Sequence, residues 1–197
     1  MALLFVPSKQ RTGVNEMEGR LPIEFNDYQK LIDHVGDPII RGFIVFGVEA
    51  GLRFNEIELI RVHDVIDCPI GSSFTVYQNK SKKNRKIFMT RNMREFIESR
   101  SDLSSDDFLF ANVRGGYPMS LKNYNRRLKG YCAELGVDPA RIGSHSCRKT
   151  FGRRLLDCGV SIEDVMVYYG HANVLTTMRY VGLLDEEMKN AVNVAFN

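Results

Sequence analysis

Residues 169–180 read Tyr-Gly-His-Ala-Asn-Val-Leu-Thr-Thr-Met-Arg-Tyr, and this stretch decides how the rest of the chain is interpreted. It places His171 nine residues before Tyr180. A phenol with a pKa of about 10 is a weak nucleophile at neutral pH, so a reactive tyrosine needs cations that stabilise its phenolate. Most tyrosines instead pack with a hydrogen-bonded hydroxyl, and we expect that role for Tyr168 and Tyr169. The importance of Tyr180 therefore depends on which cations the fold brings to it.

Two segments upstream carry cations in helical surroundings. His145-Ser-Cys-Arg148 opens a predicted helix, where two residues three apart share one face and the free N–H groups favour an anion. Ala50-Gly-Leu-Arg53-Phe-Asn-Glu56 places an arginine, whose planar fork suits bidentate phosphate binding, after an apolar helix. Taken singly, His145 could be a core or capping residue, and Arg53 could form a surface salt bridge with Glu56.

Further cations gather on a predicted hairpin and on a helix. Lys80-Ser-Lys-Lys-Asn-Arg-Lys86 lies between β-branched and aromatic stretches, which predicts an antiparallel hairpin with a basic tip. The net charge is only +3, from 27 Lys and Arg against 24 Asp and Glu, but the basic residues are segregated. Segregated charge suits phosphate neutralisation, although a solvated surface would look the same. We expect DNA contacts from Lys82, Lys83, Arg85, Arg126 and Arg127.

Hydrophobic spacing predicts a mainly α domain with a small antiparallel β-sheet, an α+β fold. Asp37-Pro38 is a typical helix start, and Asn55 and Ser144 are further candidate caps. Strands are expected at residues 74–77 and 86–90, with an earlier one near 65–67. We divide the chain into a flexible arm (1–20), one domain (21–184) and a C-terminal helix or tail (185–197). Helices are expected over residues 24–35, 39–50, 56–61, 91–100, 121–135, 146–158, 162–169, 175–181 and 186–195.

Composition excludes several other classes of protein. An apolar fraction of 44% and a charged fraction of 26% are ordinary for a globular protein. The sequence has neither a membrane-spanning apolar run nor a secretory leader pattern, so we expect a cytoplasmic protein without membrane partners. The cysteines form no C-x-x-C pair, which predicts reduced and mostly buried thiols rather than a zinc site or a disulfide scaffold. They stand at positions 68, 132, 147 and 158.

Together these motifs resemble the catalytic domain of tyrosine recombinases, the phage integrase family. That family shows Gly-Leu-Arg-x-x-Glu, a lysine in a β-hairpin, His-x-x-Arg, Gly-His, and a tyrosine nine residues after that histidine. The matching residues here, in the same order, are Arg53 with Glu56, Lys80, His145, Arg148, His171 and Tyr180. The resemblance covers nearly the whole chain after about residue 20, and it implies the tyrosine recombinase catalytic-domain fold.

The resemblance also implies a chemistry and its partners. Arg53, Arg148 and His171 would hold the scissile phosphate, Lys80 would be the general acid for the 5′-oxygen, and His145 would assist as general base. Tyr180 would form a 3′-phosphotyrosine bond without metal, cofactor or ATP. The chain would then be a site-specific DNA recombinase (integrase) on double-stranded DNA, as a tetramer in synapsis and a monomer in free solution. The helix over residues 186–195 would dock on a neighbouring subunit or fold back on its own domain.

The sequence departs from the family pattern at a few points. Cys147 stands where an aliphatic residue is common, and Lys149 stands where histidine is usual, but neither position is catalytic in the family. Lys80 is favoured over Lys82 and Lys83 as the acid, a choice that depends on hairpin register. The chain has no room for an N-terminal helical domain, so it is either a short recombinase or an isolated catalytic domain. The alternatives are a DNA-binding module that does not cleave, a relaxing enzyme of the type IB topoisomerase kind, and an unrelated helical protein.

Overall fold

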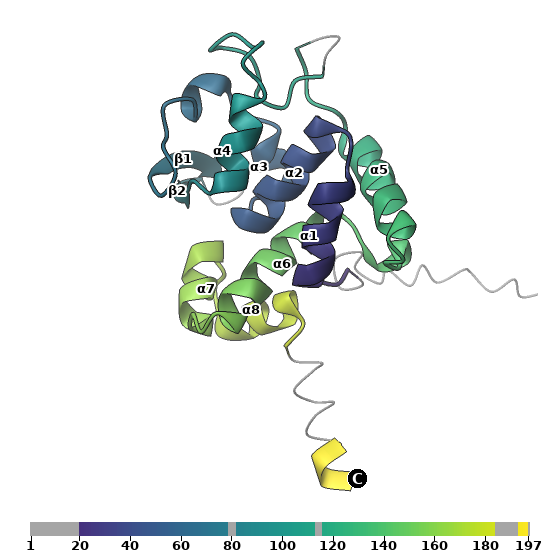
Figure 1. Cartoon of the computed structure of the whole chain (residues 1–197). Helices are drawn as coiled ribbons and strands as arrows, with labels where there is room; N and C mark the ends of the chain where they lie inside the picture. The colour runs from purple at the N-terminus through teal and green to yellow at the C-terminus, as the bar shows by residue number, and fades with distance from the viewer. Residues whose placement is uncertain (1–19, 79–81, 113–115, 184–192, 197) are drawn as a thin grey trace, which may run out of the picture.

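The computed structural model describes residues 20–78, 82–112, 116–183 and 193–196 (Figure 1). It confirms the predicted mainly helical architecture with one small antiparallel sheet. Among the described residues, no helix has the length and apolar character needed to cross a membrane. The elements are α1 (Phe25–His34), α2 (Pro38–Glu49), α3 (Phe54–Ile57), the 3₁₀ turn η1 (Val62–Asp64), β1 (Ser73–Gln78), β2 (Lys83–Phe88), α4 (Arg91–Glu98), α5 (Leu121–Glu134), the 3₁₀ turn η2 (Pro139–Arg141), α6 (Ser144–Asp157), α7 (Ile162–Tyr169) and α8 (Val174–Val181).

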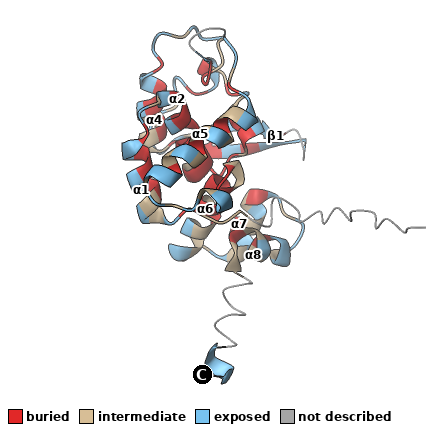
Figure 2. Cartoon of the chain, turned by 90° about the vertical axis from the view of Figure 1, so that its right-hand side faces the viewer, coloured by how far each residue is buried: buried red, intermediate tan, exposed pale blue. Residues whose placement is uncertain are grey.

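Helix α2 is the centre of the main core. Its sequence is apolar nearly all round, and it is covered by α1, α3, α4, α5 and α6. The predicted cap is confirmed, because the Asp37 carboxylate accepts from the backbone N–H groups of Ile39 and Ile40 at 2.8 and 3.0 Å. Gly47 lets α6 approach closely, since a Cβ there would lie 2.7 Å from the Cβ of Cys147. Figure 2 shows the buried residues concentrated where α2, α5 and α6 meet.

A second, smaller apolar cluster lies on the other side of α6. Val165 of α7 and Val181 of α8 are buried against Phe151 and Leu155 of α6, and Figure 1 shows α6 between α2 and the α7–α8 pair. Tyr169 belongs to this cluster, and its hydroxyl donates to the Arg148 carbonyl. Helix α6 therefore separates two cores and contacts both.

The predicted hairpin is confirmed. Strands β1 and β2 pair antiparallel, with Ser73 opposite Phe88 and Gln78 opposite Lys83. Successive side chains alternate between the core and solvent, as a strand requires. The hairpin tip, residues 79–81, lies outside the described residues, and Lys80 with it. The choice of Lys80 as the general acid therefore remains a prediction.

Residues 65–67 do not form the expected strand. The backbone N–H groups of Val65 and Ile66 both bond to the carbonyl of Val62, at 3.1 and 3.0 Å, and continue the 3₁₀ turn as a local turn. The β-branched residues of this segment therefore satisfy their backbone within the turn, and the sheet of the described residues has two strands.

Two helix starts also differ from the prediction. Helix α3 begins at Phe54 and is preceded by Arg53, so Asn55 lies inside the helix and does not cap it. Helix α6 already includes Ser144, and Gly143 is its N-cap. The predicted arm over residues 1–20 and the helix over 186–195 lie outside the described residues, except for Arg20 and residues 193–195, which are helical.

The four cysteines are free thiols, as predicted, but they are not all covered. Cys132 and Cys147 are buried and Cys68 is half-buried, whereas Cys158 is exposed. Burial raises the pKa of the Cys147 thiol to about 11. The thiols of the core therefore stay protonated at neutral pH.

Substituting Gly51 tests the turn that ends α2. Gly51 has φ +57°, and a Cβ there would lie 2.5 Å from Cδ1 of Phe151. We expect Gly51→Ala to lower the free energy of unfolding by about 2–3 kcal/mol, the sum of left-handed strain and overpacking. The matched control is Gly159→Ala, where φ is +85° but nothing lies within 4 Å, and where strain alone should cost about 1 kcal/mol. Urea denaturation measures both, and equal losses would contradict the packing argument.

Candidate active site

The turn between α2 and α3 fixes the position of Arg53. The Glu56 carboxylate accepts a hydrogen bond from the Arg53 backbone N–H at 2.9 Å and another from its guanidinium at 2.7 Å. Glu56 is buried, while the Arg53 side chain is 24% exposed. The pair is therefore not the exposed salt bridge considered above, because one partner is anchored inside the protein and the other reaches solvent.

Glu56 also faces two further arginines and a glutamine. Gln78 Nε2 donates to Oε1 at 3.3 Å, while Arg85 Nη2 and Arg148 Nη1 lie 3.7 and 3.9 Å from Oε2. Burial by itself would raise the pKa of the Glu56 carboxyl, but the Arg53 N–H and the charges of Arg148 and Arg85 outweigh it. The net result is a lowered pKa and an ionised carboxylate surrounded by an excess of positive charge.

Arg148, on α6, is a fixed internal cation. Its residue exposure is 1%. Nη1 donates to the Gly51 carbonyl, and Nη2 donates to the Tyr169 carbonyl at 3.3 Å. Burial lowers the pKa of the Arg148 guanidinium to about 10, against an opposing effect of Tyr180. Arg148 therefore remains protonated at neutral pH, and its geometry is set before any ligand arrives.

Arg85 does not lie where a DNA-contacting residue must, and that prediction is corrected. Strand alternation turns its side chain inward, where it is 7% exposed. Nη2 donates to the carbonyls of Ala50 and Gly51 at 3.3 and 3.2 Å, and the guanidinium carbon lies 4.9 Å from the centre of the Tyr168 ring. Its Nε and Nη1 have no partner among the described residues. Arg85 thus braces the turn that presents Arg53.

Tyr180 lies among the predicted histidines and cations. Its Oη is 3.3 Å from Nδ1 of His145, and its ring centre is 5.4 Å from that of His171. His171 in turn shares a 3.0 Å hydrogen bond, through Nδ1, with Oγ1 of the buried Thr177. Burial raises the pKa of the Tyr180 phenol, and the charges of Arg148 and Arg53 oppose that rise. The phenol is protonated at rest, and its deprotonation is favoured by the same cations that would hold a phosphate.

The structure brings together five predicted site residues from distant parts of the sequence. They are Arg53, His145, Arg148, His171 and Tyr180. Tyr168 and Tyr169 have the predicted packing role, with hydroxyls that donate to the carbonyls of Ala50 and Arg148. The sequence interpretation missed Gln78, which binds Glu56, and Thr177, which orients His171. Thr177 had a signal, since it lies between His171 and Tyr180 in the stretch quoted above.

The remaining predicted DNA contacts lie at the surface. Lys82 and Lys83 are exposed at the start of β2. On α5, Arg126 is exposed and donates to the Asn123 side chain at 2.9 Å. Arg127 forms an ion pair with Asp37 at 2.6 Å, which reduces its availability for a phosphate. As candidates for a phosphate contact, the exposed hairpin lysines are therefore better placed than Arg127.

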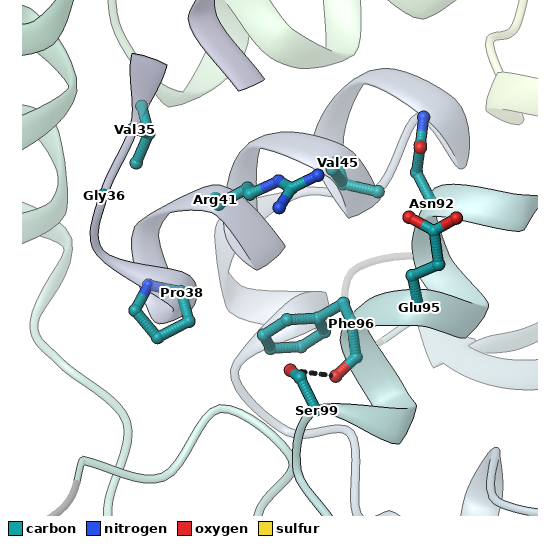
Figure 3. A pocket seen from close by; sticks show the side chains of 9 residues that line it. All are labelled: Val35, Gly36, Pro38, Arg41, Val45, Asn92, Glu95, Phe96 and Ser99. Atoms are coloured by element: carbon teal, nitrogen blue, oxygen red, sulfur yellow. Dashed lines mark hydrogen bonds between the residues drawn. The ribbon is translucent and has the colours of Figure 1, made fainter. Parts of the chain in front are cut away.

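A separate hollow lies between the α1–α2 connection and α4 (Figure 3). It has a volume of about 170 Å³. Arg41, Asn92 and Glu95 give it a polar side, while Val45 and Phe96 form an apolar one. None of the predicted site residues lines it, so it belongs to a different part of the surface from Tyr180.

The family follows from comparison with known proteins. The model of the phage integrase family matches residues 23–187. The chain belongs to the phage integrase family. It is 29% identical over 151 residues to the probable integrase/recombinase YoeC of Bacillus subtilis strain 168, an alignment covering 76% of this chain and 81% of that protein. It is 32% identical over 146 residues to a tyrosine recombinase of Pseudothermotoga lettingae, covering 73% of this chain but 49% of the relative.

Solved structures agree with this assignment at the level of the fold. The XerA recombinase superimposes with a TM-score of 0.69 and 20% identity, over 90% of this chain and 64% of that one. The catalytic domain of bacteriophage HP1 integrase gives a TM-score of 0.56 and 19% identity, over 90% of this chain and 95% of that one. The predicted family resemblance and fold are confirmed. It spans about half the length of several curated recombinases that it matches.

Neutralising Glu56 should loosen the arginine cluster in a pH-dependent way. We expect Glu56→Gln to lower the free energy of unfolding at pH 7 by about 3 kcal/mol, because buried arginines lose their counter-charge. The folded-state pKa of Glu56 is lowered, so its stabilisation is complete above the ordinary glutamate value of about 4.3 and is lost as pH falls through the folded value. The difference from the parent protein should therefore narrow below about pH 4.

Urea unfolding at pH 7 and between pH 5 and 3 measures this difference. The control is Glu58→Gln, two residues further along, because burial raises the pKa of Glu58 and its charge is not a source of stability. If the difference in free energy of unfolding between Glu56→Gln and the parent protein stays constant down to pH 3, the carboxylate charge does not hold the arginines.

Proposed function

We propose that the chain cleaves and rejoins double-stranded DNA at specific sites, through a covalent 3′-phosphotyrosine bond on Tyr180. The observation that carries the proposal is the convergence of Tyr180 with His145 and with two arginines. The phenol oxygen lies 3.3 Å from a histidine nitrogen, and both Arg148 and Arg53 act on its pKa. This proximity supports the assignment of Tyr180 as nucleophile, His145 as base and the arginines as cations for a phosphate.

The chemistry follows from these positions. The Tyr180 oxygen attacks the scissile phosphorus and forms an O–P bond, while its proton passes to His145. The bond from phosphorus to the 5′-oxygen breaks, and that oxygen takes a proton, for which Lys80 is the proposed donor. Arg53, Arg148 and His171 stabilise the charge on the non-bridging oxygens, which is the largest part of catalysis in phosphoryl transfer. Attack by the 5′-hydroxyl of another strand reverses the steps, so the phosphodiester count is unchanged.

Access to Arg148 requires a movement. Its residue exposure is 1%, so a phosphate can reach the guanidinium only after a covering group shifts. Tyr180 is the group with reason to move, because its phenol interacts with the Arg148 charge and would exchange that interaction for attack on the phosphate. We therefore include in the proposal that DNA binding draws Tyr180 away from its resting position.

Related structures support DNA as the substrate. The fold is shared by XerH recombinase bound to its palindromic difH substrate, with a TM-score of 0.70 and 17% identity. A Tn1549 transposon integrase in complex with transposon right end DNA shares it as well. We extend the proposal to a tetramer in synapsis formed from free monomers, with residues 21–184 as the catalytic domain and residues 185–197 docking on a neighbour.

The alternatives predict a different result from the same site. A non-cleaving DNA-binding module has no need of a histidine on a tyrosine oxygen or of a buried arginine beside it, whereas this chain has both. A relaxing enzyme of the type IB topoisomerase kind would use the same residues but would relax supercoils without exchanging two sites. Recombination of a plasmid that carries two sites therefore distinguishes a recombinase from a relaxing enzyme.

Replacing Tyr180 tests the nucleophile. The substrate is DNA from the flanks of the gene, nicked close to each candidate site so that a short strand is released after cleavage and the intermediate is trapped. We expect a covalent adduct that maps to Tyr180, and no adduct from Tyr180→Phe, whose DNA affinity should stay within about twofold because phosphate contacts dominate binding. Tyr168→Phe is the matched control and should still form the adduct. An adduct on another tyrosine would reassign the nucleophile, and tight specific binding without any adduct would favour the non-cleaving module.

The hairpin lysines can be tested by salt dependence. Each lysine that neutralises a phosphate releases a counterion. The double variant Lys82→Gln, Lys83→Gln should therefore make the plot of the logarithm of the DNA-binding constant against the logarithm of salt concentration less steep, by about 2. Fluorescence anisotropy with a short duplex at several salt concentrations measures the slope. Lys30→Gln on α1, which removes an exposed lysine paired with Asp27, is the control. An unchanged slope in the double variant would place DNA elsewhere on the surface.

A further inference from the structure

The first described residues of the chain run along the start of α6. We call residues 20–23 the N-terminal strap. The Leu21 N–H donates to the Arg141 carbonyl at 3.0 Å, and the Ile23 N–H donates to Oγ1 of Thr150 at 2.7 Å. The Arg20 carbonyl accepts from Nζ of Lys149 at 2.6 Å. Two consecutive residues of α6, directly after Arg148, therefore hold the strap.

Lys149 has a second neighbour that the strap does not explain. Its residue exposure is 4%, and its Nζ lies 5.5 Å from the centre of the Tyr180 ring. Burying an ammonium group is costly unless acceptors or an aromatic face compensate it. The Arg20 carbonyl and the Tyr180 ring are two such groups. The same buried cation thus contacts both the strap and the proposed nucleophile.

We propose that Lys149 is a positioning residue that couples the N-terminal strap to Tyr180, by holding the Arg20 carbonyl while stabilising the charge that develops on the phenol. The proposal rests on the assignment of Tyr180 as the nucleophile. When Tyr180 attacks, its oxygen passes from a neutral phenol towards an ester, and on rejoining it leaves as a phenolate. A cation beside the ring favours the charged form in both directions.

Other charged and titratable groups also surround Tyr180. From α3 and the turn before it come Arg53 and Glu56, from α6 come His145 and Arg148, from α7 comes Tyr169, and before α8 stands His171. In the proposed mechanism the arginines and histidines among them act on the phosphate or on the attacking oxygen. Lys149 differs because the acceptor it holds is a strap carbonyl. A displacement of the strap would therefore change the cation beside the phenol without altering the phosphate-binding groups.

The contacts give the coupling a direction. With the strap in place, the Lys149 ammonium is shared between the Arg20 carbonyl and the Tyr180 ring. When the strap is loosened, the ammonium loses the Arg20 carbonyl as an acceptor, and its interaction with the phenolate should strengthen. Conversely, removing the charge of Lys149 should make the phenol harder to ionise.

The test follows the ionisation of Tyr180 in the full chain without DNA. The protein is prepared with 3-fluorotyrosine, whose phenol is more acidic, and titrated by ¹⁹F NMR, with Tyr180→Phe identifying the resonance. Lys149→Gln keeps an N–H donor for the Arg20 carbonyl but has no charge, and Lys149→Met removes both. Both should raise the midpoint by about one pH unit. Lys149→Arg keeps the charge and should restore a midpoint close to that of the parent protein. Lys30→Met, which removes an exposed lysine on α1, should leave it unchanged.

Whether the strap stays in place is measured separately, by the rate of hydrogen exchange at the amides of Leu21 and Ile23. Exchange should speed up in Lys149→Met but not in Lys149→Gln. Thr150→Val removes the acceptor of the Ile23 N–H while leaving Lys149 in place, so it should loosen the strap and lower the Tyr180 midpoint. These readouts do not require DNA cleavage, so a covalent adduct on another tyrosine would refute the nucleophile while leaving the titrations interpretable.

Two results would overturn the inference. An unchanged midpoint in both Lys149→Gln and Lys149→Met would show that Lys149 has only a structural role. A Thr150→Val variant with faster strap exchange but an unmoved midpoint would show that strap and nucleophile are not coupled.

Discussion

One buried carboxylate organises the cationic centre of this protein. Arg53 comes from the α2–α3 turn, Arg85 from the hairpin and Arg148 from α6, and all three face Glu56. Three guanidinium groups at this range would repel one another strongly in a medium of low polarity, and removing the single anion would leave that repulsion uncompensated. The Gly51 carbonyl adds a second anchor, because it accepts from both Arg85 and Arg148. Three elements of the fold are therefore held in register by one side chain and one peptide group.

This arrangement explains why the guanidinium of Arg148 is oriented before any ligand arrives. The guanidinium of Arg148 is held by carbonyls of two different segments, and its burial lowers the pKa only to about 10, so the charge persists at neutral pH. A cation whose orientation is fixed needs little reorganisation when charge develops on a phosphate, and that is the main advantage of a preorganised site over water. The same burial blocks access, because a ligand cannot reach the guanidinium of Arg148 until Tyr180 or another covering group moves.

The sequence was sufficient for features that depend on local chemistry. The cap at Asp37, the apolar helix α2, the hairpin and the assembly of five site residues were all predicted, because caps, periodicity and motif spacing are written in neighbouring residues. The failures concern features set by distant contacts. Arg85 looks like any other basic residue of the hairpin, and only the register of the strands decides that it faces inward, since a shift of one residue reverses every side chain. Residues 65–67 have the composition of a strand, yet they find their hydrogen bonds within a turn. Lys149 was expected on a helix, but its contacts with the strap and with Tyr180 could not be predicted, because those partners lie far from it in the sequence.

The position of α6 explains why the chemistry is found at a boundary. One face of this helix packs on α2 through Cys147 and Gly47, and another packs on Tyr169 and Val181 through Gly152. Charged groups fit in neither apolar cluster, so Arg148 and Lys149 lie at the seam between the two, where backbone carbonyls of Gly51, Tyr169 and Arg20 satisfy them. The smaller cluster, which carries α8 and Tyr180, meets the larger one at this seam, and each apolar cluster has its own packing. In the proposed mechanism Tyr180 exposes a buried arginine and then attacks, and its place on the smaller cluster, with the cations anchored to the larger one, suits that movement.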